Sequence, residues 1–397
     1  MALFIVCVID VLGFGILIPL IPYLAAQFGA TPTLNTWLVA IYSACQLLAA
    51  PLWGRLSDRL GRRPILLSSM FGAASSYVIL AFAHSILVLF IARALAGFMA
   101  GNLSAAMAYA SDISAPADRA KTMGTVGAAI GIGFMLGPAI GGALAGEQVQ
   151  SASFLRPALA SISLSVLAML LVLFLLPESH QGRGSTAPRV PVMTLLRSLP
   201  GLRWITLGTL LVTFSQSTMD SIFAIWAMNR YHVGPRTVGL AMFILAIVAV
   251  GVQGGLVRRL APRFGETALA LAAIACYVLG LTTVALGADV AVVILGLVLC
   301  GLGAGLYNPS GSALASGEGD AGNRGAVMGT YQTGTSLARV LAPLASGPIY
   351  MQFGASAPFL VASVVTLQAV WCILALRRAH AADRVSADLG DRQRSIR

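Results

Sequence analysis

Long apolar runs separated by short polar segments set the pattern of this chain. A helix that crosses a membrane needs about 20 mostly apolar residues. Twelve runs of the 397-residue chain reach that length, at residues 2–25, 36–54, 65–83, 86–109, 122–146, 155–176, 204–228, 237–257, 267–286, 290–313, 326–350 and 356–376. The pattern therefore predicts an all-α membrane protein with twelve transmembrane helices.

The longest polar interval, residues 177–203, falls midway along the chain and contains the Gly, Pro, Ser and Arg typical of a flexible linker. We expect an N-terminal bundle of six helices over 1–176, a cytoplasmic linker over 177–203, a second bundle of six over 204–376 and a cytoplasmic tail over 377–397. Within the linker, residues 193–199 predict a short interfacial helix.

The two halves share a sequence pattern, which indicates a duplicated unit. Five residues of the first half, Arg119, Met123, Gly124, Pro138 and Gly142, recur at a constant offset of 205 as Arg324, Met328, Gly329, Pro343 and Gly347. The copies also differ, because the position of Asp58 is taken by Pro262 in the second half. The acidic function of that segment is therefore present only once.

Composition and charge agree with a membrane protein. Soluble chains carry about 25% charged residues, whereas this chain has 10% and is 58% hydrophobic. Its net charge of +11 sits in short segments between apolar runs, which orients the chain and does not predict a nucleic-acid partner. With residues 55–64 inside, 20 of the 25 Lys and Arg are cytoplasmic and both termini lie in the cytoplasm.

Cysteine usage and the first run exclude other classes. The five cysteines stand singly inside apolar runs, so neither a disulfide framework nor a metal site is predicted. No basic segment precedes the first run, which we interpret as a retained helix and not as a cleaved signal peptide. The sequence has no phosphate loop, metal-spaced ligands or nucleophile motif, so we predict no catalytic residues and no enzymatic activity.

The polar segment between the second and third runs is Gly54-Arg55-Leu56-Ser57-Asp58-Arg59-Leu60-Gly61-Arg62-Arg63-Pro64. Its four arginines predict a cytoplasmic loop. Gly54 and Gly61 permit a tight turn, and Pro64 suits the first turn of the following helix.

This segment resembles the signature loop between helices 2 and 3 of the major facilitator superfamily, through Gly54, Asp58, Arg59, Gly61, Arg62 and Arg63. An orientation signal alone would explain the arginines but not the spacing of the glycines and Asp58. The resemblance implies two pseudo-symmetric six-helix bundles with the substrate site between them near the bilayer midplane. We expect Arg62 to pair with Asp112, and Asp58 to accept hydrogen bonds from N–H groups near residues 325–327.

The fifth run resembles the motif characteristic of facilitator antiporters, with every fixed position filled by Gly124, Gly133, Gly137, Pro138, Gly141 and Gly142. Small residues let helices approach closely, and Pro138 interrupts the helix hydrogen bonds. Glycine-rich packing of membrane helices is the alternative interpretation. The resemblance implies export by exchange and not uptake.

Two acid–arginine combinations lie inside apolar runs, where charges are costly and usually functional. Arg93 belongs to an R-x3-G-x3-G pattern, and Asp10 lies in a first helix resembling that of tetracycline-type exporters. At 1.5 Å per residue Arg93 lies ~10 Å from the outer surface and Asp10 ~12 Å from the inner one, within side-chain reach. Asp220 and Arg339 form the corresponding combination in the second half, although Asp220 also fits a polar patch. We expect these four residues to couple protons to transport, or Asp10 and Arg93 to form a permanent ion pair.

Polarity and position predict the cavity lining as Asp10, Phe14, Asn102, Gln216, Asp220, Tyr307, Asn308 and Gln332. The whole chain resembles twelve-helix drug:proton antiporters, which implies a monomer in the bacterial inner membrane exporting a small hydrophobic or cationic compound. The proton is the coupling ion, and no cofactor is implied. The third and ninth spans lack the acids of tetracycline exporters. A metabolite transporter for a sugar, siderophore or lipid precursor is the alternative, followed by a transport-inactive sensor.

Overall fold

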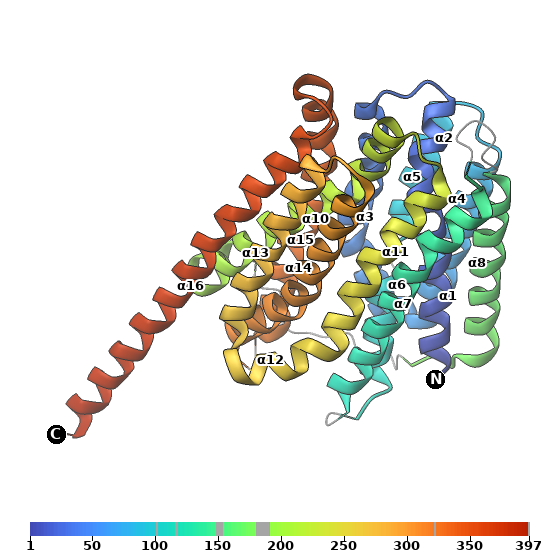
Figure 1. Ribbon diagram of the computed structural model, residues 1–397. Coiled ribbons are helices and arrows are strands. Elements are labelled where there is room, and N and C mark those ends of the chain that lie inside the picture. Colours follow the sequence, from blue (N-terminus) through green and yellow to red (C-terminus); the bar gives the residue numbers. More distant parts are fainter. Residues whose placement is uncertain (101, 116–117, 148–153, 180–190, 321–322, 396–397) are drawn as a thin grey trace. The chain divides into compact units, whose positions relative to one another are not determined.

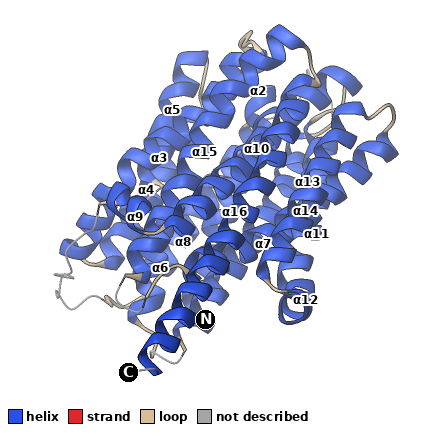
Figure 2. Ribbon diagram, turned by 90° about the vertical axis from the view of Figure 1, so that its left-hand side faces the viewer, coloured by secondary structure: helices blue, strands red, loops and turns tan. Residues whose placement is uncertain are grey.

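The computed structural model describes residues 1–100, 102–115, 118–147, 154–179, 191–320 and 323–395 (Figure 1). Helices make up all the regular structure in these ranges (Figure 2). The chain divides into two compact units. Unit 1 contains Met1–Ala187, Asp220–Val250 and Val340–Pro358, and unit 2 contains Pro188–Met219, Gly251–Arg339 and Phe359–Arg397.

The first span of unit 1 is broken near its end. Helix α1 (Ala2–Leu17) is followed by a 3₁₀ turn (Ile18–Leu20) and by α2 (Ile21–Gln27). Pro19 and Pro22 lie at these junctions, where each removes a backbone donor that a continuous helix would need. The break follows from the two prolines.

The polar segment predicted as a loop is largely helical, which corrects that expectation. Helix α3 (Pro32–Leu60) continues through Gly54, and α4 (Arg62–Ala81) begins directly after Gly61. Gly61 has a φ of 102°, a conformation that favours glycine, and this single residue turns the chain. Pro64 lies in the first turn of α4, as expected.

The span predicted over 86–109 is divided into α5 (Ile86–Met99) and α6 (Asn102–Asp112). The indole Nε1 of Trp53 donates to the Phe98 carbonyl at 2.5 Å, and the Ser69 hydroxyl donates to the Met99 carbonyl. These side chains take up carbonyls that the end of α5 leaves without helical partners.

Helices α7 (Arg119–Ala145) and α8 (Leu155–Leu175) complete the first half of the chain. Helix α1 packs against both, α4 packs against α8, and α3 packs against α5. Apolar clusters fill this bundle at two levels, one around Leu66 and Val172 and the other around Ile16 and Leu38.

The second half begins with a short helix, α9 (Val192–Ser198), at the position where a short helix was expected, residues 193–199. It continues with α10 (Pro200–Tyr231), α11 (Pro235–Gly251), a π-helical turn (Val252–Leu256), α12 (Val257–Phe264), α13 (Glu266–Leu286), α14 (Val290–Gly317), α15 (Arg324–Phe353) and α16 (Ala357–Ser395). Helices α13 and α14 pack closely together. Helix α16 runs past residue 376, so the segment expected as a tail continues the last helix.

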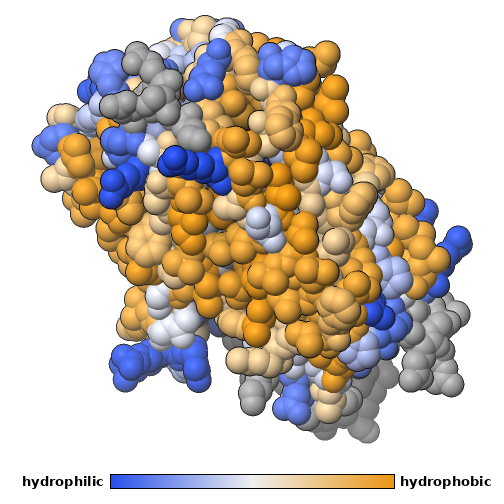
Figure 3. All heavy atoms as spheres, turned by 90° about the vertical axis from the view of Figure 1, so that its right-hand side faces the viewer, coloured by the Kyte–Doolittle hydropathy of each residue, from blue (hydrophilic) through white to orange (hydrophobic). Residues whose placement is uncertain are grey.

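The described residues include nine helices that are long and apolar enough to cross a membrane. The other predicted spans, at 86–109, 204–228 and 326–350, are also helical, as α5 with α6, α10 and α15. Large apolar side chains are exposed on the outside, and Figure 3 shows them covering most of one face. Such a surface is unfavourable in water and suits lipid. The protein is a multi-pass integral membrane protein.

Candidate transport site and gating contacts

The predicted signature segment forms a charged cluster around Arg62. Its Nη1 donates to Asp58 Oδ1 at 2.8 Å and to Ser57 Oγ at 3.0 Å, and its Nε donates to Asp112 Oδ2 at 3.0 Å. The Arg62 side chain is only 12% exposed, so partial desolvation strengthens both ion pairs relative to a surface pair. Arg62 thereby joins α3, α4 and α6, and the pair expected with Asp112 is present.

Glu178 completes this cluster, although its position in the sequence predicted only a place in the linker. Its carboxylate accepts from the backbone N–H groups of Arg62 at 2.9 Å and Arg63 at 3.1 Å, at the start of α4. These N–H groups have no partner within the helix, and the helix dipole favours an acid there. A Cβ on Gly61 would lie 2.5 Å from Glu178 Oε2. The signal in the sequence was an acid placed directly after the sixth apolar run.

Gly54 and Arg59 stand outside the cluster. A Cβ on Gly54 would meet nothing within 4 Å, and the Arg59 side chain is exposed. The Arg63 guanidinium donates to the Leu173 carbonyl near the end of α8. The structure therefore brings together Asp58, Gly61, Arg62, Arg63 and Asp112 of the predicted set.

The glycines of the predicted antiporter motif place α7 directly against α1. A Cβ on Gly133 would lie 2.7 Å from Val11 Cβ, and one on Gly137 would lie 2.6 Å from Gly15 Cα. A Cβ on Gly141 would overlap the Ile16 carbonyl. This stripe of small residues holds the helix that carries Asp10 and Phe14 against α7.

A second face of α7 contacts α11. A Cβ on Gly142 would lie 2.5 Å from the Pro235 carbonyl oxygen, and one on Gly239 would overlap the Pro138 carbonyl. Gly124 takes no part in either contact, because a Cβ there would meet nothing within 4 Å. The motif therefore packs one helix against a neighbour from each half of the chain.

Arg93 lies in the interior of unit 1 and is 7% exposed. Its Nε donates to the Leu38 carbonyl at 3.2 Å, and its guanidinium carbon lies 4.4 Å from the Tyr42 ring centre and 6.0 Å from that of Phe14. The Phe14 and Tyr42 rings stack with centroids 5.1 Å apart. A buried cation is thus stabilised partly by aromatic faces.

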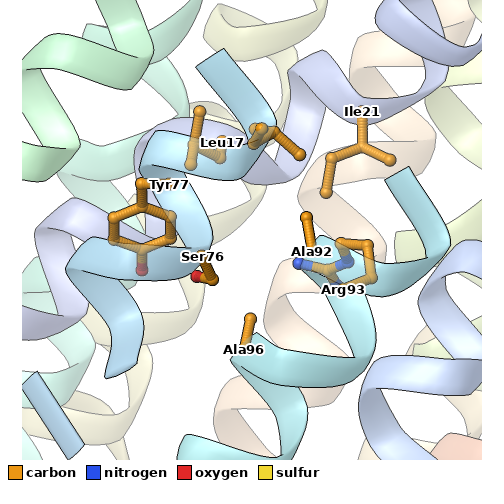
Figure 4. A pocket seen from close by; sticks show the side chains of 8 residues that line it. Leu17, Ile21, Ser76, Tyr77, Ala92, Arg93 and Ala96 are labelled. Carbon is orange, nitrogen blue, oxygen red and sulfur yellow. The ribbon is translucent and has the colours of Figure 1, made fainter. Parts of the chain in front are cut away.

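Polar groups from several helices share this region. Arg93, Tyr77 and Ser76 line one small cavity, with Leu17, Ile21, Leu80, Ala92 and Ala96 as its apolar walls (Figure 4). Asp10, on α1, is half-buried. Tyr77 was not among the predicted site residues, because a lone tyrosine in an apolar run carries no signal by itself.

Three predicted cavity residues of unit 2 come from α10 and α14. The Tyr307 and Thr209 hydroxyls are 3.1 Å apart in the interior, and Gln216 Nε2 donates to Asn308 Oδ1 at 3.5 Å. Asn308 is exposed, as is Gln332 on α15. Polar side chains of unit 2 thus occur on α10, α14 and α15, whose sequences are otherwise mostly apolar.

The remaining predicted residues are Asp220, Arg339 and Asn102. Asp220 is exposed on the part of α10 that belongs to unit 1, and Arg339 is exposed on the part of α15 that belongs to unit 2. The Asn102 side chain lies outside the described residues. Within the described ranges, no group of three or more His, Cys, Asp or Glu side chains is arranged to hold a metal ion.

Charged and polar groups inside membrane helices mark functional sites, among them the substrate and ion pathways of transporters. Residues 3–317 and 259–396 match the family model described as Major Facilitator Superfamily. The chain belongs to this superfamily. It is a secondary transporter of a small molecule across a membrane, and not an enzyme.

The chain is similar to several named members of transporter and resistance families. The chain is 29% identical to "Tetracycline resistance protein, class C" of Escherichia coli, covering 93% of this chain and 94% of the relative. It is 28% identical to "Multidrug resistance protein 2" of Bacillus subtilis (strain 168), covering 90% and 89%. The structure of the human organic anion transporter MFSD10 (TETRAN) superposes with a TM-score of 0.71 at 25% identity, covering 94% of this chain and 98% of that one.

Proposed function

We propose that this protein exports a small hydrophobic or cationic compound from the cytoplasm in exchange for protons by alternating access. The observation that carries the proposal is the packing of α7, whose glycines contact α1 on one face and α11 on the other. Because α1 carries Asp10, rocking of α11 against α7 would change the packing of the helix that lies against a membrane-embedded acid. An antiporter requires this connection between conformation and proton affinity.

The names of two relatives support drug-like substrates and a role in antibiotic resistance. One is called a tetracycline resistance protein and the other a multidrug resistance protein. The proposed location is the bacterial inner membrane, and the distribution of Lys and Arg supports an orientation with both termini in the cytoplasm. A protease-protection or cysteine-labelling map of both termini tests this orientation.

The substrate test uses purified protein in liposomes that contain a pH-sensitive dye. A panel of lipophilic cations, neutral compounds and anions is added, and proton movement on each addition is recorded. We expect release of protons with hydrophobic or cationic compounds and none from empty liposomes. Substrate movement without any proton movement would contradict exchange, and no response from any compound would contradict export of drug-like molecules.

A second candidate substrate is an organic anion, which the surroundings of Arg93 favour. Its guanidinium lies beside the stacked rings of Phe14 and Tyr42, a combination that suits a planar aromatic carboxylate or sulfate. The solved relative named as an organic anion transporter gives independent support. The same panel separates the candidates, because anions and not cations would then drive the response.

A further inference from the structure

Glu147 follows α7 and contacts the start of α11. Its Oε1 accepts from the Gly234 backbone N–H at 3.2 Å and from the Thr237 hydroxyl at 2.7 Å. Both partners precede or occupy the first turn of α11, where backbone N–H groups lack helical acceptors. An acid from one half of the chain therefore satisfies the start of a helix in the other half.

Two further hydrogen bonds to backbone carbonyls stabilise the same contact. The Arg236 N–H donates to the Gly146 carbonyl at 3.2 Å, and the Tyr23 hydroxyl donates to the Val233 carbonyl at 2.9 Å. Gly234 sits so close that a Cβ there would overlap the Glu147 backbone. All of these residues belong to unit 1. The two backbones are therefore in direct contact, and a side chain at Gly234 would force them apart.

The contact differs from the helix starts capped by their own sequence. At α14, Asp289 Oδ1 accepts from the Val292 N–H of its own first turn at 3.0 Å, and Thr31 and Ser85 act likewise at α3 and α5. Such local caps are retained when a helix moves as a body. The Glu147 contact is made between two helices, so it must break whenever α11 moves away from α7.

Exposure makes the contact reversible. Glu147 and Thr237 are both exposed, so water can replace each partner when the helices separate. The contact also lies at the end of α7 opposite to its start, whereas the Arg62 cluster lies at the end of the bundle where α6 ends and α4 begins. One end is thus held by Arg62 with two acids, and the other by Glu147 with the start of α11.

We propose that Glu147 is a positioning residue for transport: its carboxylate latches α11 to α7 at the end remote from Arg62, and that end opens when the latch releases. The proposal rests on the proposed function, since it assumes that these helices rock during transport. The Glu147 carboxylate makes this contact only while that end of the protein is closed.

The test measures opening directly by the distance between two spin labels in a cysteine-free background. The labels replace Phe82, which follows α4, and Leu240 on α11, both exposed residues of unit 1. We expect Glu147→Ala to raise the population at longer distance about tenfold, the ratio for a lost charge-assisted hydrogen bond. Glu147→Gln, which keeps an acceptor, and Thr237→Val, which removes one donor, should each give a smaller rise.

Asp289→Asn is the matched control, because it alters an acid that caps only its own helix; its distances should stay unchanged. Unaltered distances in both Glu147→Ala and Thr237→Val would overturn the latch. A purely structural role would lower the amount of folded protein without changing the ratio of the two populations. The readout needs no substrate or proton gradient, so failure of the exchange assay and failure of the latch are distinguishable.

Discussion

Gly137 of α7 and Gly15 of α1 approach so closely that a Cβ on Gly137 would lie 2.6 Å from the Gly15 Cα. No side chain lies between the two backbones at this point. The close approach explains why the motif needs glycine there, since even a methyl group must displace one helix. Substitutions at two glycines of the same motif, one in contact and one not, therefore test this packing.

Gly137→Val should lower stability by about 1–3 kcal/mol, the usual cost of overpacking a close contact, and should reduce transport. Gly124→Ala is the control, because a Cβ at Gly124 would meet nothing within 4 Å. That variant should be neutral or stabilised by up to about 1 kcal/mol through its higher helix propensity. Thermal unfolding in detergent measures both. Equal stability of the two variants would contradict the α1–α7 packing.

Asp58→Asn should lower transport while the amount of folded protein stays near that of the wild type. The carboxylate of Asp58 pairs with Arg62, which keeps its second partner Asp112 in the variant. The Asp58 side chain is still 34% exposed, so solvent screening keeps the loss of this ion pair to roughly 1 kcal/mol or less. Transport in liposomes and yield after gel filtration are compared. Wild-type transport rates would refute a gating role for Asp58.

Glu178→Ala should destabilise the protein by about 0.5–2 kcal/mol, because it leaves two N–H groups at the start of α4 without their cap. Glu178→Gln retains an acceptor oxygen and should lose less. Unfolding temperatures in detergent give the comparison. If the two variants are equally stable, the hydrogen bonds to Arg62 and Arg63 do not support α4.

Asp10→Asn should abolish accumulation driven by a pH difference and retain substrate binding and downhill exchange. The amide cannot take up or release a proton, while its size and polarity remain close to those of the acid. Uptake into liposomes with and without a pH difference separates the two activities. A variant that still concentrates substrate against its gradient would transfer the coupling role to Asp220, which the same substitution then tests.

Much of the fold was determined by local sequence. The membrane solvent demands about 20 apolar residues with internally satisfied backbones, so length and hydrophobicity alone locate helices such as α8 and α13. The motif glycines were also visible, since their spacing is a property of the chain itself. The pair of Arg62 with Asp112 was expected because Asp112 ends an apolar run on the same cytoplasmic side as Arg62. Membership of the superfamily also follows from the sequence alone, because the family model matches it directly.

Tertiary structure decided which groups meet. The segment from Gly54 to Leu60 is helical because Gly61 alone makes the turn, and turning at one residue brings the N–H groups of α4 to Glu178. Glu147 reaches a helix start some 90 residues away, at Gly234 and Thr237. The spacing of apolar residues along the chain does not predict such a partner. The contact depends on how two helices pack and not on the apolar length of either.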